Sequence, residues 1–352
     1  MIDPAEATVD DRAAPTLEEV ARVAGVSRST VSRVINELPG VSERARTAVA
    51  KAIETLRYVP NEAARSLATR RTNSIALVVS EHGDQVFGDP FFAGVLRGVH
   101  AGLASSKRQL VLMLMTQDDD GEALASYLCG GHVDGALVVS LHGRDPLPQR
   151  LAEAGLAVVL VGRPLSGARV PYVDSDNFTG GLLAARHLVA TGRRRIATIA
   201  GPNDMAAGID RLVGWRRGMA EAGLPTDVLV RSDFTIEAGA AAMAEVVANH
   251  PDVDAVFAAA DIIAVGAMRE LRARELRIPQ DVALVGFDDS VLATSAIPQL
   301  TTVRQPVEEL GRTVIWRLLA QLNGETDLPP SVSLPTELVV RESSRKGVTA
   351  ET

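Results

Sequence analysis

The sequence has little of what disulfide-linked, metal-binding or membrane-spanning proteins need. It contains one cysteine, Cys129, so no disulfide can form within the chain. Its six histidines are scattered singly, without the C-x-x-C or H-E-x-x-H spacing of metal sites, and neither a metal nor a cofactor is expected. No apolar run approaches the length of about 18 residues that a transmembrane helix needs, so no membrane partner is expected.

The sequence also lacks the signatures of secretion and of catalysis. Residues 1–14 are acidic and polar, unlike a secretory signal, so we expect a cytoplasmic protein associated with the nucleoid. The phosphate-loop, dinucleotide and serine-nucleophile patterns G-x-x-x-x-G-K-[ST], G-x-G-x-x-G and G-x-S-x-G are absent. The sequence therefore predicts a protein that is not an enzyme.

Positive charge is concentrated near the N-terminus. The whole chain carries −8, which by itself argues against a nucleic-acid partner. Residues 15–72, however, carry +4, with ten Arg and Lys against six acidic residues, while residues 1–14 carry −3 and residues 73–352 carry −9. Only the N-terminal fifth is therefore a candidate surface for binding phosphates.

Three short helices are predicted in this basic segment. Thr16 and Glu19 have the spacing of a capping box at the start of the first helix, and Gly25 ends that helix. Ser27 is placed to cap a second helix and Ser42 a third, each with an apolar stripe at helical spacing. A helix, a short glycine turn and a second helix form the helix-turn-helix geometry that reads DNA.

Short apolar runs alternate with helical stretches from residue 73 onward, as in parallel sheets covered by helices. The expected strands are 75–80, 110–115, 135–140, 158–161, 196–200, 255–259 and 282–286, with a pause at 171–177. The predicted fold is an all-α head with a hinge helix, followed by an α/β core of two doubly wound lobes. The expected boundaries are a disordered tail at 1–14, the head at 15–59, the hinge helix at 60–72, the core at 73–345 and a second tail at 346–352.

Long motifs in the chain resemble the LacI/GalR family of bacterial repressors. T-L-E-E-V-A-R-V-A-G-V-S-R-S-T-V-S-R-V-I-N at 16–36 and Y-V-P-N-E-A-A-R-S-L-A at 58–68 carry the resemblance in the head. D-R-L-V-G-W at 210–215, V-G-F-D-D at 285–289 and T-T-V-R-Q-P at 301–306 extend it through the core. D-P-F-F-A-G at 89–94 and L-H-G-R-D-P-L-P-Q at 141–149 are similar to an actinobacterial branch that governs the use of cellobiose and related β-glucosides.

The resemblance implies a periplasmic-binding-protein-like core, with the N-lobe about 73–173 and 305–334 and the C-lobe about 174–304 and 335–345. It also implies that the head reads bases through its second helix and that Leu67 of the hinge enters the minor groove. The alternatives are that the polar residues of the second helix are only solvated and that Leu67 packs against Tyr58. The DNA-binding residues expected on this basis are Thr16, Ser27, Arg28, Ser29, Thr30, Ser32, Arg33, Asn36, Tyr58, Asn61, Ala64 and Leu67.

The resemblance further places an effector site in the core. Arg211 and Asp288 match the family's effector-gripping pair, for which a structural ion pair is the alternative. Phe91, Phe92 and Phe234 match pocket-wall aromatics, for which core packing is the alternative. Arg163 stands where an acidic residue is common in the family, and Ala260 where Asn or Ser is common beside Asp261. The expected effector residues are Phe91, Phe92, Arg163, Arg211, Phe234, Asp261, Asp288 and Gln305.

The implied function is a homodimeric or tetrameric repressor that a small sugar effector releases from a palindromic operator. Cellobiose or a related β-glucoside is the expected effector. Three alternatives remain open at this point: a co-repressor-dependent regulator, a sugar-binding transport component with the same two-lobed architecture, and an enzyme with an incidental helical domain. The basic head argues against the transport component.

The charge distribution generates a first prediction. Residues 1–72 should be required for DNA binding, because they hold the basic surface, and operator affinity should fall steeply as salt rises. Fluorescence anisotropy with a labelled operator, recorded from low to high salt, measures both properties. Undiminished operator binding by a fragment spanning 73–352 would contradict this assignment.

Overall fold

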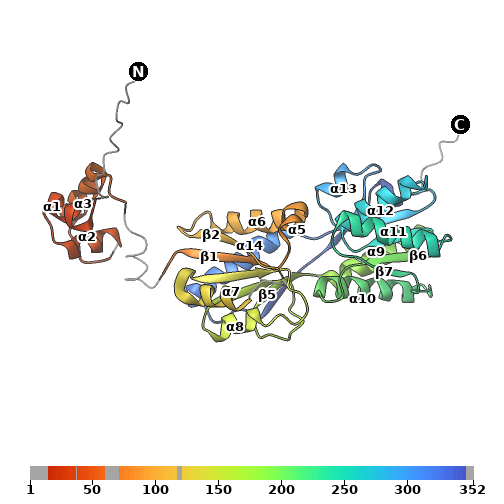
Figure 1. Ribbon diagram of the computed structural model, residues 1–352, viewed down its shortest axis with the longest axis horizontal. Coiled ribbons are helices and arrows are strands. Elements are labelled where there is room, and N and C mark those ends of the chain that lie inside the picture. Colours follow the sequence, from red (N-terminus) through yellow and green to blue (C-terminus); the bar gives the residue numbers. More distant parts are fainter. Residues whose placement is uncertain (1–14, 37, 60–70, 117–120, 346–352) are drawn as a thin grey trace, which may run out of the picture. The chain divides into compact units, whose positions relative to one another are not determined.

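The computed structural model describes residues 15–36, 38–59, 71–116 and 121–345 (Figure 1). The chain divides into two compact units, a head within residues 1–72 and a core within 73–352, which are described separately. The predicted tails and most of the predicted hinge helix, with Asn61, Ala64 and Leu67, lie outside the described residues. Among the described residues, no helix is long and apolar enough to cross a membrane.

The head consists of α1 (Leu17–Ala24), α2 (Arg28–Ile35) and α3 (Glu43–Leu56). The predicted capping box is present, because Thr16 accepts a hydrogen bond from the Glu19 N–H and the Glu19 carboxylate accepts one from the Thr16 N–H. Gly25 ends α1 in the left-handed conformation, as glycine does readily, and Ser27 and Ser42 cap α2 and α3. A small core of buried residues holds the helices together: Val20, Ala21, Val31, Val49, Ala52 and Tyr58.

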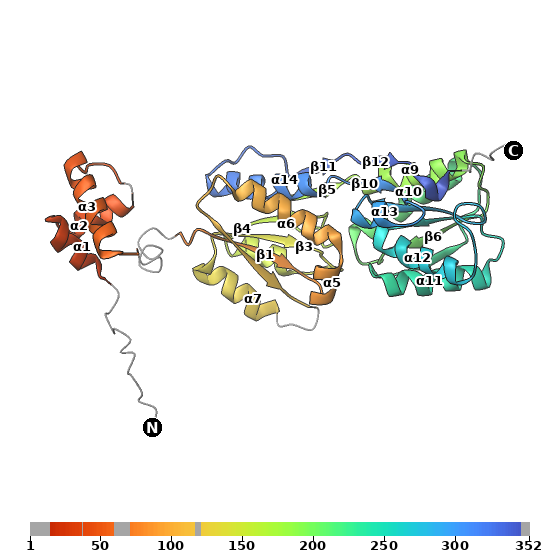
Figure 2. The same cartoon turned by 90° about the horizontal axis from the view of Figure 1, so that it is seen from above.

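The first sheet of the core is parallel throughout and has the order β11-β5-β4-β3-β1-β2. Its strands are β1 (Ser74–Val79), β2 (Gln109–Leu114), β3 (Gly135–Val139), β4 (Ala157–Val161), β5 (Tyr172–Ser175) and β11 (Ser331–Leu334). One face is covered by α6 (Pro90–Leu103) and α14 (Val307–Leu322), which lie side by side (Figure 2). The opposite face is covered by α7 (Gly121–Tyr127) and α8 (Leu147–Glu153). The N-lobe is completed by α5 (Gly83–Gly88) and η1 (Leu128–His132).

The second sheet has the order β12-β10-β9-β8-β6-β7 and is parallel except for the pairing of β12 with β10. Its strands are β6 (Ile196–Ala200), β7 (Leu229–Arg231), β8 (Ala255–Ala258), β9 (Ala283–Asp288), β10 (Thr301–Arg304) and β12 (Glu337–Val339). One face of this sheet is covered by α9 (Asn177–Ala190) and α10 (Ala206–Glu221). The other face is covered by α11 (Ile236–Asn249) and α12 (Asp261–Ala273). The C-lobe also contains α13 (Val291–Ser295) and η2 (Glu342–Ser344).

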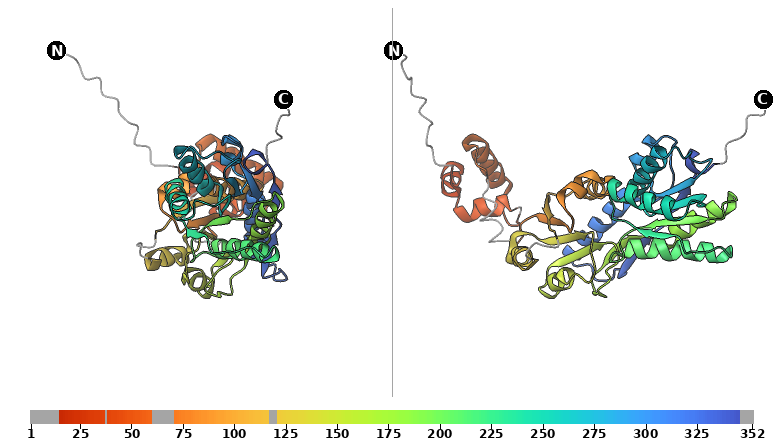
Figure 3. Two further views of the ribbon diagram at one scale, coloured as in Figure 1. Left: turned by 90° about the vertical axis from the view of Figure 1, so that its right-hand side faces the viewer. Right: turned by 45° about the vertical axis from the view of Figure 1, so that its right-hand side comes forward.

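The chain crosses between the two lobes of the core three times (Figure 3): after β5, after β10, and between β11 and β12. The crossing segments are tied to one another. The Ser175 hydroxyl donates to Gln305 Oε1 at 2.9 Å, and the Thr336 hydroxyl donates to the Asp176 carbonyl at 3.1 Å. The Asp176 N–H also donates to the Leu334 carbonyl at 2.8 Å. The three connections therefore act as one hydrogen-bonded hinge.

The two-lobed architecture and each of the expected strands are present, with small shifts at their ends. The expected pause at 171–177 was wrong, because it contains β5, which pairs with β4 and β11. The sequence analysis did not predict β7, β10, β11 and β12. Each of these strands has only three or four residues, too few to show a period in apolar residues.

Helices α9 and α10 approach each other through glycines. A Cβ atom on Gly181 would lie 2.1 Å from the Arg211 carbonyl oxygen, and one on Gly214 would lie 2.0 Å from the Phe178 carbonyl oxygen. Both distances are shorter than any tolerated contact, so each glycine allows backbone to meet backbone. This packing fixes the helix that carries Arg211 directly against the hinge-proximal helix α9.

Gly214→Ala should therefore destabilise the core, because the added methyl group forces α9 and α10 apart. We expect a loss of about 1–3 kcal/mol in the free energy of unfolding, or more if the helices cannot move. Urea denaturation followed by circular dichroism measures it. Gly88→Ala is the matched control, since a Cβ atom there would have no neighbour within 4 Å. Equal stabilities of the two variants would contradict the close helix packing.

Candidate functional site

Helix α2 presents an exposed polar surface at its N-terminal end. The Ser27 hydroxyl accepts the Thr30 N–H and lies 2.8 Å from the hydroxyls of both Ser29 and Thr30. Arg28 is exposed and forms an ion pair with Glu18 of α1 at 3.0 Å. Such a solvent-exposed pair contributes little to stability, so Arg28 can leave Glu18 for another partner at small cost.

The other head residues expected at DNA have contacts within the protein. The Arg33 guanidinium donates to the Pro39 carbonyl at 2.5 Å, which secures the loop between α2 and α3. The Asn36 amide donates to the Ser32 carbonyl at 2.9 Å at the end of α2. Tyr58 is only 9% exposed and belongs to the apolar core of the head. Its ring packs with residues of α1, α2 and α3, and a contact of its remaining exposed part with DNA stays a prediction.

The core contains two neighbouring cavities at the carboxyl ends of its strands, the usual position of ligand sites in open α/β sheets. One, of about 80 Å³, is lined by residues of both lobes that include Phe91, Arg163 and Arg211. The other, of about 610 Å³, is lined by residues that include Asp89 and Asp288. Phe91 and Gln305 line both cavities. We call the two together the interlobe cleft.

Arg211 of α10 is the most connected side chain of the cleft. It is 5% exposed, and its Nε donates to Asn177 Oδ1 at 2.9 Å while Nη1 donates to the Ala259 carbonyl at 2.6 Å. The guanidinium carbon lies 3.7 Å from the centre of the Phe287 ring, and Nη1 lies 3.6 Å from Asp288 Oδ1. The guanidinium thus joins α9 to the ends of β8 and β9 and holds Asp288 nearby.

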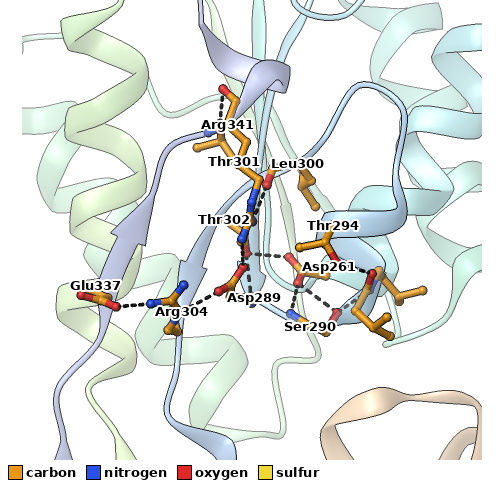
Figure 4. A network of polar contacts seen from close by, with 12 residues as sticks. Asp261, Asp289, Ser290, Thr294, Leu300, Thr301, Thr302, Arg304, Glu337 and Arg341 are labelled. Atoms are coloured by element: carbon orange, nitrogen blue, oxygen red, sulfur yellow. Dashed lines mark hydrogen bonds and ion pairs between the residues drawn. The ribbon is translucent and has the colours of Figure 1, made fainter.

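Asp288 is aimed by an unusual backbone. Asp288 and Asp289 both have positive φ values, 116° and 53°, which non-glycine residues adopt only where the surroundings enforce it. The surroundings are polar (Figure 4): Asp289 accepts hydrogen bonds from Arg304 at 2.6 Å and from Arg341 at 2.5 Å. Gln305 then donates to Asp288 Oδ1 at 2.6 Å. The Asp288 carboxylate of the cleft is therefore hydrogen-bonded directly to Gln305 of the interlobe hinge.

The structure gives Asp261 a different place from the one expected. Its side chain is fully buried, and it accepts hydrogen bonds from the Thr302 hydroxyl at 2.6 Å and from the Ser290 N–H and hydroxyl (Figure 4). Burial raises the pKa of this carboxyl to about 7, against those hydrogen bonds. We therefore revise its role from effector contact to an anchor for the loop that follows β9.

The expected aromatic residues separate into two groups. Phe91 lines both cavities of the cleft. Phe92 is 8% exposed and belongs to the apolar core between α6 and the first sheet. Phe234 packs against the C-lobe core and over Gly201, where a Cβ atom would meet the ring at 2.7 Å. Core packing, the alternative for these rings, therefore accounts for Phe92, whereas the side chain of Phe234 is only partly buried and its place in the effector site stays a prediction.

The cleft holds more acid than base. Arg211 is attracted by Asp288, Asp174, Asp89 and Asp261, and burial lowers the pKa of its guanidinium against these attractions. Burial raises the pKa of Asp89 and Asp174, and it raises the pKa of Asp288 well above the usual range although Arg211 opposes the shift. The buried carboxylates gain from any group that donates hydrogen bonds to them.

Several cleft residues were missed by the sequence analysis. Asp174 and Asn177 lie at the end of β5 and the start of α9, inside the stretch expected to be a pause. Asp210 lines neither cavity but pairs with the cleft residue Arg163, with both carboxylate oxygens 2.8 Å from Nη2. Asp89 lies two residues before Phe91 in the D-P-F-F motif and could have been found from that motif. Recognising β5 would have indicated the other residues near it.

A helix-turn-helix head on a two-lobed core with a buried polar cleft defines the class of ligand-responsive DNA-binding regulators. Comparison with known proteins agrees with this class. Residues 16–61 match the model of bacterial regulatory proteins of the lacI family, and residues 185–344 match that of the periplasmic binding protein-like domain.

Two relatives and two solved structures are similar over most of their length. The HTH-type transcriptional regulator CelR of Thermobifida fusca is 50% identical over 95% of this chain and 100% of its own. The HTH-type transcriptional repressor PurR of Shigella sonnei is 34% identical over 94% of this chain and 97% of its own. A CelR–cellobiose complex has a TM-score of 0.75 at 49% identity, covering 94% of this chain and 99% of that one. A lac repressor dimer bound to operator and an anti-inducer has a TM-score of 0.82 at 25% identity, over 94% of this chain and 99% of that one.

The chain belongs to the lacI family of bacterial regulatory proteins. It is a DNA-binding transcriptional regulator and not an enzyme. The sequence-based predictions of family, fold and general function are confirmed.

The exposed end of α2 generates a prediction about base recognition. Arg28→Ala should weaken binding to the cognate operator by about 1–3 kcal/mol and weaken binding to random DNA much less, because a guanidinium fork reads guanine. Anisotropy titrations on both DNAs measure the difference. Lys51→Ala, an exposed cation on α3, is the control. An equal loss on both DNAs would make Arg28 a phosphate contact.

Proposed function

We propose that this protein is a transcriptional repressor that binds a palindromic operator as a homodimer and is released by a small neutral sugar, with cellobiose as the leading candidate. The observation that carries the proposal is the interlobe cleft, in which buried carboxyl groups and the buried guanidinium of Arg211 lie beside a cavity lined by Phe91. The chain is 50% identical to CelR of Thermobifida fusca, and a regulator named CelR has been solved in complex with cellobiose. Both findings support the choice of sugar.

The electrostatics of the cleft favour a neutral, hydroxyl-rich ligand. Asp89, Asp174 and Asp288 line the cleft around Arg211, its one buried guanidinium, so acceptors for hydroxyl groups are close to a donor. Sugar hydroxyls donate hydrogen bonds to carboxylates and accept them from arginine. The Phe91 ring offers an apolar face for the CH groups of a sugar ring. The cavity of about 610 Å³ lies within the usual range of ligand sites, about 300–1,000 Å³.

Exposed leucines on the N-lobe support the proposed dimer. Leu112 and Leu114 project from β2, an edge strand, and are 38% and 40% exposed. Leu96 of α6 is exposed to a similar degree. An edge strand with exposed leucines is a surface that a second protein chain can cover. Two heads in one dimer are what a palindromic operator requires.

The proposed mechanism links the cleft to the hinge through one hydrogen-bond chain. Arg211 holds Asp288, Asp288 accepts from Gln305, and Gln305 accepts from Ser175 in a second crossing segment. A ligand that binds Asp288 and Gln305 differently in two lobe arrangements shifts the balance between them. Because the coupling is reciprocal, operator must weaken sugar binding by the same factor by which sugar weakens operator binding.

Operator affinity measured with and without cellobiose tests this proposal. We expect cellobiose to weaken operator binding of the unmodified protein, and we expect Asp288→Asn and Arg211→Ala to reduce cellobiose affinity by about 10- to 100-fold. That loss corresponds to one or two charge-assisted hydrogen bonds. Operator affinity without sugar should change little, because both residues lie in the core. Isothermal titration calorimetry and operator anisotropy give the two affinities.

Arg216→Ala is the matched control, since Arg216 is exposed on the same helix as Arg211. Asp288→Asn is nearly isosteric, so it separates loss of the charge from loss of the fold. Tighter operator binding with cellobiose would overturn release in favour of co-repression. No cellobiose binding, with an intact response to another neutral sugar, would overturn only the choice of sugar.

A further inference from the structure

A histidine connects the two lobes beside the cleft. His142 lies in the loop after β3 in the N-lobe, with Nε2 2.9 Å from Glu81 Oε1 and Nδ1 3.0 Å from Asp204 Oδ2. Glu81 follows β1 in the same lobe and also accepts a hydrogen bond from the Ser140 hydroxyl at 2.5 Å. Asp204, in contrast, belongs to the C-lobe loop before α10. Both ring nitrogens thus face carboxylates, one on each side of the interlobe boundary.

The same two loops meet at a second point. The Gly143 N–H donates to the Asp204 carbonyl at 2.7 Å, so backbone and side chain of Asp204 are both engaged by the 142–143 segment. A little further along α10, Asp210 is paired with Arg163 of the N-lobe. Two interlobe contacts therefore hold the N-terminal part of α10, the helix that carries Arg211.

The two contacts differ in chemistry. Arg163 keeps its charge at every accessible pH, so loss of a proton from the cation does not break its pair with Asp210. His142 loses a proton within the accessible range, and only its doubly protonated ring can donate to Glu81 and Asp204 at once. The neutral ring has one N–H donor and must abandon one of the two carboxylates.

We propose that Glu81, His142 and Asp204 form a proton-dependent latch that favours the closed arrangement of the lobes, so that His142 is a positioning residue for the effector cleft. Closed here means the arrangement in which His142 contacts Asp204, and the inference rests on the proposed function only in taking a change of lobe arrangement as the response to effector. Glu81 holds the ring within its own lobe, and the Nδ1 proton makes the connection to Asp204. Removing that proton breaks the contact between His142 and Asp204. Of the two side-chain contacts between the lobes described above, only the Arg163–Asp210 ion pair then remains.

The surrounding charges determine the direction of the pH effect. The Glu81 hydrogen bond, with a smaller contribution from Asp204, raises the pKa of His142 to about 9 against the cost of burial. Asp145 and Arg150 line the cavity on which His142 lies, and Arg150 is paired with Glu122 at 3.2 Å. Opening removes Asp204, so the pKa of His142 is lower in the open arrangement. Closure is therefore favoured below that lower pKa, and the preference disappears as pH rises through about 9.

The test measures lobe separation directly in the full chain without any sugar. Cys129, the single and exposed cysteine, carries one spin label in the N-lobe, and Ala220→Cys on the exposed face of α10 supplies the second in the C-lobe. Double electron–electron resonance gives the distance distribution between the labels. We expect the ratio of closed to open molecules to fall as pH rises from 7 to 10.

His142→Gln and Asp204→Asn should each lower that ratio about three- to tenfold at pH 7, the effect of one partly exposed charged hydrogen bond. Both variants should lose the pH dependence, and their combination should be no more open than either alone. His100→Gln, an exposed histidine on α6, is the matched control and should leave both properties unchanged.

Three results would overturn the latch: unchanged distances in both variants, additive effects of the two substitutions, or pH dependence that persists without His142. Circular dichroism of each variant separates opening from unfolding, and Asp204→Asn keeps the test decisive if His142→Gln does not fold. Failure of the cellobiose and operator experiment leaves this measurement unaffected, because no sugar or DNA enters it.

Discussion

The contacts of a single buried guanidinium organise the interlobe cleft. Arg211 has almost no contact with water, so its charge must be balanced and hydrogen-bonded by the protein. Its partners come from the start of α9, the end of β8 and the end of β9. Gly181 and Gly214 allow α9 and α10 to approach closely enough for those contacts. The positive-φ loop that carries Asp288 is held from the other side by Asp261, Arg304 and Arg341.

Local chemistry made much of the fold predictable from sequence. Caps at Thr16, Ser27 and Ser42 depend on residues three positions apart, so short-range patterns were enough to identify the three head helices. The longer buried strands were equally visible as apolar runs. Strands β10, β11 and β12 were not, because each has only three or four residues, and β11 is also stabilised by pairing with β5, which is far away in the sequence. The interleaving of the lobes is a property of that long-range pairing.

The site was less predictable than the fold, and the reason is geometric. A sequence motif gives the residue type and position but not the direction in which a side chain points. Asp261 and Asp288 both follow strands of one sheet, yet one carboxylate is enclosed by Thr302 and Ser290 while the other lies at the cleft. Tyr58 and Phe92 are aromatic residues in strongly matching motifs, and both pack into cores. The His142 contacts join segments about sixty residues apart, and no local pattern indicates them.

Gln305 lies in one of the three connections between the lobes, where its side chain bonds to a cleft carboxylate and to a second connection. The lobes can rotate as rigid bodies about these connections, which act as the hinge. Atoms at the hinge then move little, whereas atoms elsewhere move in proportion to their distance from the hinge axis. A small change around the Gln305 amide is therefore amplified at the far edge of each lobe. The position of the amide, bonded to a cleft carboxylate and to a second connection, therefore couples the cleft to the arrangement of the lobes.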